Sequence, residues 1–150
     1  MLATMTTEIK MWIGVDLDGT LAYAGDGPKW NKDHIGDPIP DMAVRVRNAL
    51  EAGEEIKIFT ARVGTGRGLS PTSGFVDTQE FADEQRQMIQ DWTEEHFGVR
   101  LEVTAQKDWA LKEIWDDRAK EVVKNTGRFA VDFWRDLFRD IYHAMGGVQL

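Results

Sequence analysis

The chain has 150 residues, 42% of them hydrophobic and 29% charged, which predicts one folded domain with its own core and excludes wholesale disorder. Its formal net charge of −8 argues against a general affinity for nucleic acid, because contacts to phosphate dominate that binding. No cysteine is present and no apolar run approaches the roughly 20 residues that span a bilayer, so disulfides, thiolate metal sites and membrane spans are excluded and a cytoplasmic location is expected.

Strands and helices are predicted to alternate along the chain. Short apolar runs predict strands, whereas apolar residues at helical spacing, bounded by proline and glycine, predict helices. The predicted strands are residues 10–15, 55–60, 99–104 and 111–115, and the predicted helices are residues 41–52, 78–96 and 118–125. Apolar residues from Phe133 to Tyr142 predict a further amphipathic helix. Residues 1–9 are expected to form a flexible terminus ahead of one domain spanning residues 10–150.

This alternation indicates an α/β fold, with a Rossmann-like parallel sheet between helices on both faces. Ligands of such sheets bind in the crevice beyond the carboxyl ends of the strands. Candidate site residues should therefore come directly after strands, and polar residues do follow all four predicted strands.

Two aspartates, Asp16 and Asp18, follow the first predicted strand in the segment DLDGTL. Residues two apart in an extended segment point to the same side, and two carboxylates placed there repel each other unless a cation or a proton shares the site. A hard divalent ion such as Mg²⁺ accepts oxygen ligands of this kind. The alternative is a turn in which both aspartates hydrogen-bond the backbone.

The polar residues after the other strands each have two interpretations. Thr60 could donate its hydroxyl to a phosphate oxygen, or it could be a turn or cap residue. Lys107 could neutralise a phosphate, or it could lie on the solvated surface. Asp116 and Asp117 follow the last strand, where one of them could cap a helix instead of binding a metal.

Taken together, these motifs resemble those of the haloacid dehalogenase-like (HAD) hydrolase superfamily, and in particular its phosphatases. DLDGTL matches the first motif in full, Thr60 the second, Lys107 the third and Asp116-Asp117 the fourth. The resemblance covers roughly residues 10–125 and implies a three-layer HAD fold, hydrolysis of phosphate esters and a Mg²⁺ cofactor. An acid at position 18 is similar to the phosphatases and unlike the dehalogenases or the phosphorylating ion pumps.

The resemblance also implies roles for the aspartates. Asp16 would be the nucleophile and form an aspartyl-phosphate, while Asp18 would protonate the leaving oxygen and then activate water. Mg²⁺ would be held by the Asp16 carboxylate, the Asp18 backbone carbonyl and an acid of the fourth motif. Asp117 is favoured as that direct ligand, with Asp116 supporting it.

Three further residues would contact the substrate. Thr60 and Lys107 would stabilise charge on the transferring phosphoryl group, as the resemblance implies. Arg62, two residues past Thr60, would also touch the substrate, or it would be a surface arginine.

The gaps between the motifs are too short for a cap domain, so the resemblance implies a capless member with an open site. The loops at residues 23–39 and 64–74 could partly cover it, with Trp30 stacking on a base and Arg67 holding a second phosphate, or they could simply pack and be solvated. The arginines after the second and fourth motifs also resemble the 3′-phosphatase part of polynucleotide kinases.

The expected function is that of a Mg²⁺-dependent phosphomonoesterase acting on a nucleotide, a 3′-phosphorylated nucleic-acid end or a small metabolite. Phosphoryl transfer to an acceptor other than water stays open, as does phosphate-ester binding without turnover. The C-terminal apolar stripe is expected to cover the flank of the sheet, with a homodimer contact as the alternative.

Overall fold

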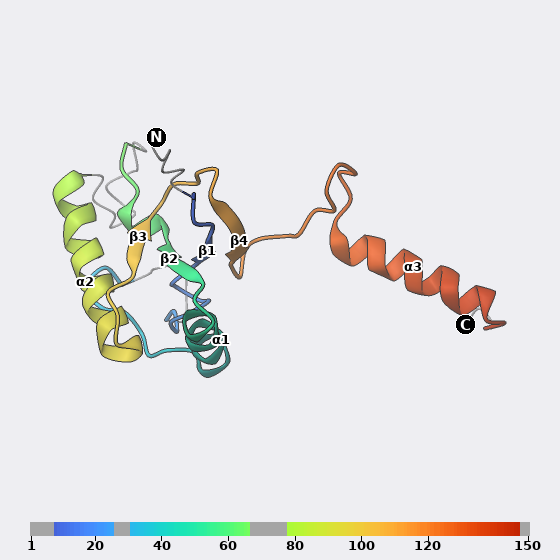
Figure 1. Cartoon of the computed structure of the whole chain (residues 1–150), viewed down its shortest axis with the longest axis horizontal. Helices are drawn as coiled ribbons and strands as arrows, with labels where there is room; N and C mark the ends of the chain where they lie inside the picture. Colours follow the sequence, from blue (N-terminus) through green and yellow to red (C-terminus); the bar gives the residue numbers. More distant parts are fainter. Residues whose placement is uncertain (1–7, 26–30, 67–77, 148–150) are drawn as a thin grey trace, which may run out of the picture. The chain divides into compact units, whose positions relative to one another are not determined.

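The computed structural model describes residues 8–25, 31–66 and 78–147 (Figure 1). The chain divides into two compact units, Met1–Asp117 and Arg118–Leu150. The prediction that residues 10–150 form one domain stays a prediction, and most of the terminus expected to be flexible lies outside the described residues.

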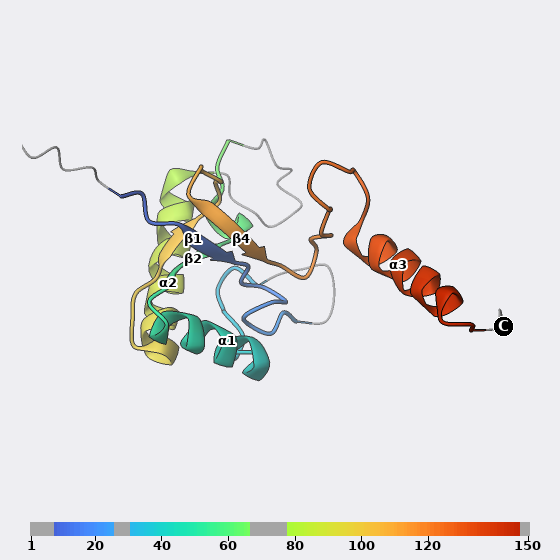
Figure 2. The same cartoon turned by 45° about the vertical axis from the view of Figure 1, so that its right-hand side comes forward.

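The first unit contains a four-stranded sheet in which every strand is parallel to its neighbours, in the order β3-β2-β1-β4. Its strands are β1 (Trp12–Val15), β2 (Glu55–Phe59), β3 (Glu102–Thr104) and β4 (Leu111–Trp115), which confirms all four predicted strands. Val15, the last residue of β1, is in register with Ile58 of β2 and with Trp115 of β4. Figure 2 shows the arrows of β1 and β4 side by side and pointing the same way. The carboxyl ends of β1 and its two neighbours therefore meet at one edge.

Two helices connect these strands, and local signals in the sequence set their ends. α1 (Pro40–Glu51) begins at a proline, whose missing N–H costs nothing in the first turn of a helix. α2 (Gln79–Phe97) begins after Thr78, whose hydroxyl accepts the N–H of Phe81 at 3.2 Å. Gly98 ends α2 in the left-handed region, with φ 74°. Both helices were predicted within a few residues.

Both helices lie on one face of the sheet. The connections from β1 to β2 and from β2 to β3 advance in the same direction, and right-handed crossovers then place α1 and α2 on the same face. Ile56 and Ile58 of β2 are buried in the core on this face, whereas Lys57 and Phe59 alternate with them and are only partly buried. The α/β class and the parallel sheet are confirmed. Helices on both faces, the layering of the HAD fold, stay a prediction.

The second unit corrects one prediction. Residues 118–125 do not form a helix: Val122 pairs with Phe129 in an isolated antiparallel bridge, and the N–H of Val123 donates to the carbonyl of Arg128 at 2.9 Å. The chain reverses between them through Asn125 (φ 64°) and Gly127 (φ 70°), and positive φ values of this kind interrupt a right-handed helix.

The C-terminal amphipathic helix is confirmed as α3 (Ala130–Ala144). Within its unit the apolar side chains of Trp134, Phe138 and Tyr142 are exposed. Its expected packing on the sheet, and the alternative homodimer, stay predictions. None of the helices in the described ranges is long and apolar enough to cross a membrane.

Candidate metal centre

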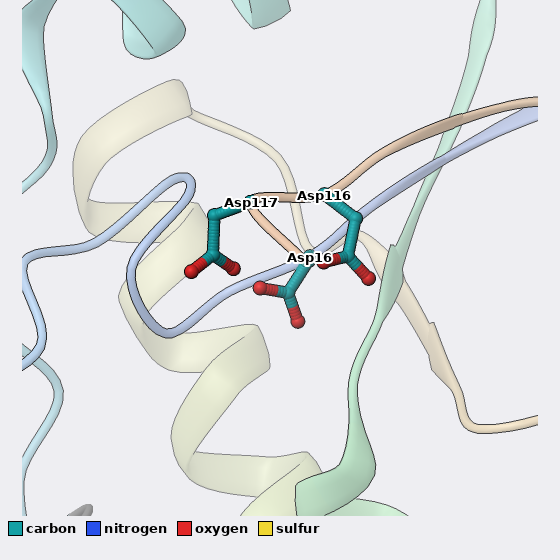
Figure 3. A group of neighbouring side chains, drawn as sticks. All are labelled: Asp16, Asp116 and Asp117. Atoms are coloured by element: carbon teal, nitrogen blue, oxygen red, sulfur yellow. The ribbon is translucent and has the colours of Figure 1, made fainter. Parts of the chain in front are cut away.

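Three carboxylates from two adjacent strand ends converge in the first unit (Figure 3). Asp16 directly follows β1, and Asp116 and Asp117 directly follow β4. One oxygen of each carboxylate lies within 4.8 Å of the others. The N–H of Asp16 donates to the carbonyl of Trp115 at 2.9 Å, so the pairing of the two strands continues into the cluster. Oxygen donors of this kind suit a hard cation such as Mg²⁺.

The loop after β1 is held by backbone hydrogen bonds and by buried side chains. The Leu17 carbonyl accepts three backbone N–H groups, those of Thr20, Leu21 and Ala22. The side chains of Leu17 and Leu21 are fully buried and anchor the loop in the core.

Glycine is required at the tip of this loop. Gly19 has a φ of +89°, a conformation that costs an L-residue roughly 1–2 kcal/mol. A Cβ at this position would lie 3.2 Å from Oδ2 of Asp117. The glycine of DLDGTL therefore lets the loop turn while bringing it close to the carboxylate from β4.

The residue that links the carboxylates is Thr20, for which the sequence predicted no role of its own. It is 7% exposed, and its Oγ1 accepts the N–H of Asp117 at 3.0 Å. The hydroxyl proton is within reach of Asp16 Oδ2 at 3.1 Å and of Asp117 Oδ1 at 3.3 Å. Its place in the motif, four residues after Asp16, was the signal that could have found it.

The pKa of Asp16 shows that the cluster disfavours negative charge when no cation is bound. Burial, the largest cause, and the nearby charges of Asp116 and Asp117 together raise this pKa from the usual 3.8 to about 6. The hydrogen bond from Thr20 acts in the opposite direction. A divalent cation among the three carboxylates would relieve this repulsion, which is the behaviour expected of a metal site.

Asp18 does not join the cluster, because its side chain is bound to Arg62. The guanidinium of Arg62 donates to Oδ2 of Asp18 from Nε at 2.7 Å and to Oδ1 from Nη2 at 2.6 Å. Arg62 is 3% exposed, so the interpretation of this residue as a surface arginine is wrong. The short 3₁₀ turn Ala61–Val63, which follows β2, turns the arginine inward toward the loop after β1. The expected contact of Arg62 with substrate stays a prediction.

Thr60 lies in the next position along the same edge of the sheet. It follows β2, is buried, and donates its N–H to the carbonyl of Thr104 at 2.9 Å. Its hydroxyl accepts the N–H of Arg62 at 3.2 Å, which makes it the cap of the 3₁₀ turn. The hydroxyl proton has no acceptor among the described residues, which leaves it available to a phosphate oxygen.

Lys107 is not brought into contact with the carboxylates. Its side chain is exposed in the connection from β3 to β4, and within the described part of the chain no hydrogen bond or ion pair joins it to Asp16, Asp116 or Asp117. Its role in binding phosphate stays a prediction.

A cavity of about 740 Å³ opens beside the carboxylates. Gly19, Thr20, Asp116 and Asp117 form one part of its wall, and Met42 and Arg45 of α1 form another. The acidic pair after β4 is therefore reached from an open space.

No protein-family model, curated protein or solved structure matches this chain. The resemblance to the HAD phosphatases therefore depends on the motifs and on where they lie in the fold. Trp30 and Arg67, the two loop residues predicted to contact substrate, lie outside the described residues.

Proposed function

We propose that this protein is a HAD-type phosphomonoesterase that uses Mg²⁺ and forms an aspartyl-phosphate on Asp16. The observation that carries the proposal is the convergence of Asp16, Asp116 and Asp117 after two neighbouring parallel strands. This edge of a parallel sheet is where α/β proteins bind ligands. Acidic groups are common on protein surfaces, but these three directly follow strand ends, and one of them, Asp16, has a raised pKa.

The residues of the cluster would hold the cofactor. Asp16 and the acids after β4 supply the carboxylates, and Thr20 fixes the orientation of Asp16 and Asp117 through its hydroxyl. When bound, Mg²⁺ would supply positive charge that stabilises the phosphoryl oxygens in the transition state.

The reaction would proceed in two displacements. Asp18 would first have to take up a proton beside Arg62. A carboxylate oxygen of Asp16 then attacks phosphorus, the bond from phosphorus to the ester oxygen breaks, and Asp18 gives that proton to the departing oxygen. Asp18 then takes a proton from water, which attacks the aspartyl-phosphate and releases inorganic phosphate. Thr60 would donate its free hydroxyl proton to the phosphoryl group, and Lys107 would add positive charge from the connection after β3.

The expected substrate is a phosphate monoester, with a nucleotide or a 3′-phosphorylated nucleic-acid end as the first candidates. The net charge of −8 disfavours long nucleic acids over small esters. Phosphoryl transfer to a different acceptor would use the same first displacement. Binding without turnover is the remaining alternative.

The test is release of phosphate from p-nitrophenyl phosphate and from a panel of nucleotides and 3′-phosphorylated oligonucleotides, with Mg²⁺ and with EDTA. Turnover that requires Mg²⁺ and disappears in Asp16→Asn is the expected result. Loss of the substrate phosphate without an equal gain of inorganic phosphate would indicate transfer to another acceptor. Binding of Mg²⁺ and of substrates with no turnover on the whole panel would indicate a binding protein.

A further inference from the structure

We propose that Arg62 is a positioning residue that fixes the Asp18 carboxylate, and that Gln85 in turn fixes Arg62. This inference rests on the proposed function, in which Asp18 gives a proton to the leaving oxygen. It assigns Arg62 to the acid rather than to the substrate phosphate, and it adds Gln85 to the residues on which catalysis depends.

The geometry of the pair fits a positioning role. Two parallel hydrogen bonds, from Nε at 2.7 Å and from Nη2 at 2.6 Å, hold both oxygens of Asp18. Such a fork fixes the plane of the carboxylate, which a single bond from an ammonium group would not do. Exposure is unequal: Arg62 is 3% exposed and Asp18 is 23% exposed. The arginine therefore stands behind the carboxylate, which keeps access to solvent.

The guanidinium is itself held by two elements distant in sequence. Its Nη1 donates to Oε1 of Gln85 on α2 at 3.0 Å, and its Nη2 also donates to the carbonyl of His34 at 3.2 Å. Gln85 is 2% exposed, and its amide nitrogen donates to the carbonyl of Lys32 at 2.8 Å. That second bond orients the amide so that its oxygen faces Arg62.

A buried charge would be costly here unless it were paired and hydrogen-bonded, and these contacts pair it with Asp18 and engage all three guanidinium nitrogens. The fork occupies the edge of Arg62 formed by Nε and Nη2, the edge that binds a carboxylate or phosphate in two-pronged fashion. A phosphate could use this edge only by displacing Asp18. The arrangement therefore favours control of the acid over direct phosphate binding.

The test compares kcat/KM for two substrates, since this ratio covers only the steps up to departure of the leaving group. 2-Phenylethyl phosphate has a poor leaving group that needs a proton, whereas p-nitrophenyl phosphate has a good one that does not. In Arg62→Lys, kcat/KM for the alkyl ester should fall about tenfold to a hundredfold. This is a part of the roughly 10²–10⁴-fold acceleration that a positioned general acid supplies. The ratio for the aryl ester should change by less than about threefold, because that ester needs no such proton.

Asp18→Asn should give the same selective loss, and the double variant Asp18→Asn with Arg62→Lys should lose little more, because the two residues act as a unit. Gln85→Met, which keeps the charge of the site, should show a smaller loss with the same selectivity. It also keeps the inference testable should Arg62→Lys fail to fold.

Equal losses on the two esters in Arg62→Lys and in Gln85→Met, or additive losses in the double variant, would overturn the inference while leaving the proposed function intact. Absence of Mg²⁺-dependent turnover by the unaltered protein, both of these two esters and of the whole panel of nucleotides and 3′-phosphorylated oligonucleotides, would overturn the proposed function, and the inference with it.

Discussion

The hydroxyl of Thr20 lies 3.1 Å from Oδ2 of Asp16 and connects the first carboxylate of the cluster to the loop that carries it. Oγ1 of Thr20 also accepts the N–H of Asp117 at 3.0 Å. One buried side chain thus links the ends of β1 and β4 at the three carboxylates.

Thr20→Val should therefore weaken Mg²⁺ binding while keeping the shape of the side chain. The variant leaves the N–H of Asp117 without its partner, and loss of an outer partner of a metal ligand costs roughly 10–100-fold in affinity. The unpaired group should also lower the free energy of unfolding by about 1–3 kcal/mol. Isothermal titration with Mg²⁺ and urea unfolding measure the two effects. Thr20→Ser, which keeps the hydroxyl, is the control, and equal Mg²⁺ affinity in the valine and serine variants would contradict this role.

The affinity for Mg²⁺ should depend on pH through Asp16. A carboxylate has to lose its proton to bind the metal, and the pKa of Asp16 is raised to about 6 in the metal-free protein by burial and by its acidic neighbours. The association constant should fall about tenfold per pH unit below this value and level off above it. An affinity that stays constant between pH 5 and 7 would contradict the combination of a raised pKa and a metal-binding role for Asp16.

The same raised pKa makes Asp16 destabilising at neutral pH when no metal is present. The folded state binds the proton of Asp16 more tightly than the unfolded chain, so this contribution favours folding at low pH and is lost as pH rises from 3.8 to about 6. In EDTA, Asp16→Asn should therefore gain stability relative to the unaltered protein between pH 4 and 7, measured as the difference in Tm. A difference that shrinks over this range would contradict the direction of the shift.

Gly19→Ala should weaken Mg²⁺ binding through local geometry, since its Cβ would stand 3.2 Å from Oδ2 of Asp117. The chain offers a matched control in Gly53, which has a similar φ of +82° but nothing within 4 Å of its Cβ position. Both alanine variants should lose about 1–2 kcal/mol of stability from the positive φ. Only Gly19→Ala should lose Mg²⁺ affinity, and comparable losses in both variants would attribute the effect to general destabilisation.

Lys107→Ala should lower kcat/KM for phosphate esters on the order of tenfold or more, if the lysine places its charge on the phosphoryl group. Lys112→Ala is the control, because Lys112 lies in β4, five residues further along the chain, and its ammonium group pairs with Glu54 at 2.6 Å. Stability should change by less than about 1 kcal/mol in both variants, because exposed ion pairs contribute little. Equal activity of the two variants would remove Lys107 from the mechanism.

Much of the sheet and the acidic cluster could be predicted from the sequence, because both follow from local patterns. Short apolar runs defined the strands, and parallel pairing then aligns their carboxyl ends. This alignment is why Asp16 and the acids after β4, about a hundred residues apart, were expected at one place.

Features that depend on contacts between residues distant in the sequence could not be predicted. The burial of Arg62 depends on α2 bringing Gln85, and the segment after residue 30 bringing the His34 carbonyl, to the same point. Nothing beside Arg62 in the sequence records these partners. The wrong helix at residues 118–125 has a related cause: the pairing of Val122 with Phe129 outweighs the local helical pattern.

The most direct test of the central claim is to find the phosphoryl group on Asp16. The protein is mixed with Mg²⁺ and a phosphate ester that it hydrolyses, and the reaction is quenched in acid within one turnover. The protein is then digested and analysed by mass spectrometry. One phosphoryl group is expected on the peptide that contains Asp16, and it should be absent when EDTA is present and absent from Asp16→Asn. Turnover at an undiminished rate with no phosphorylated peptide, or with the group on another residue, would contradict the central claim.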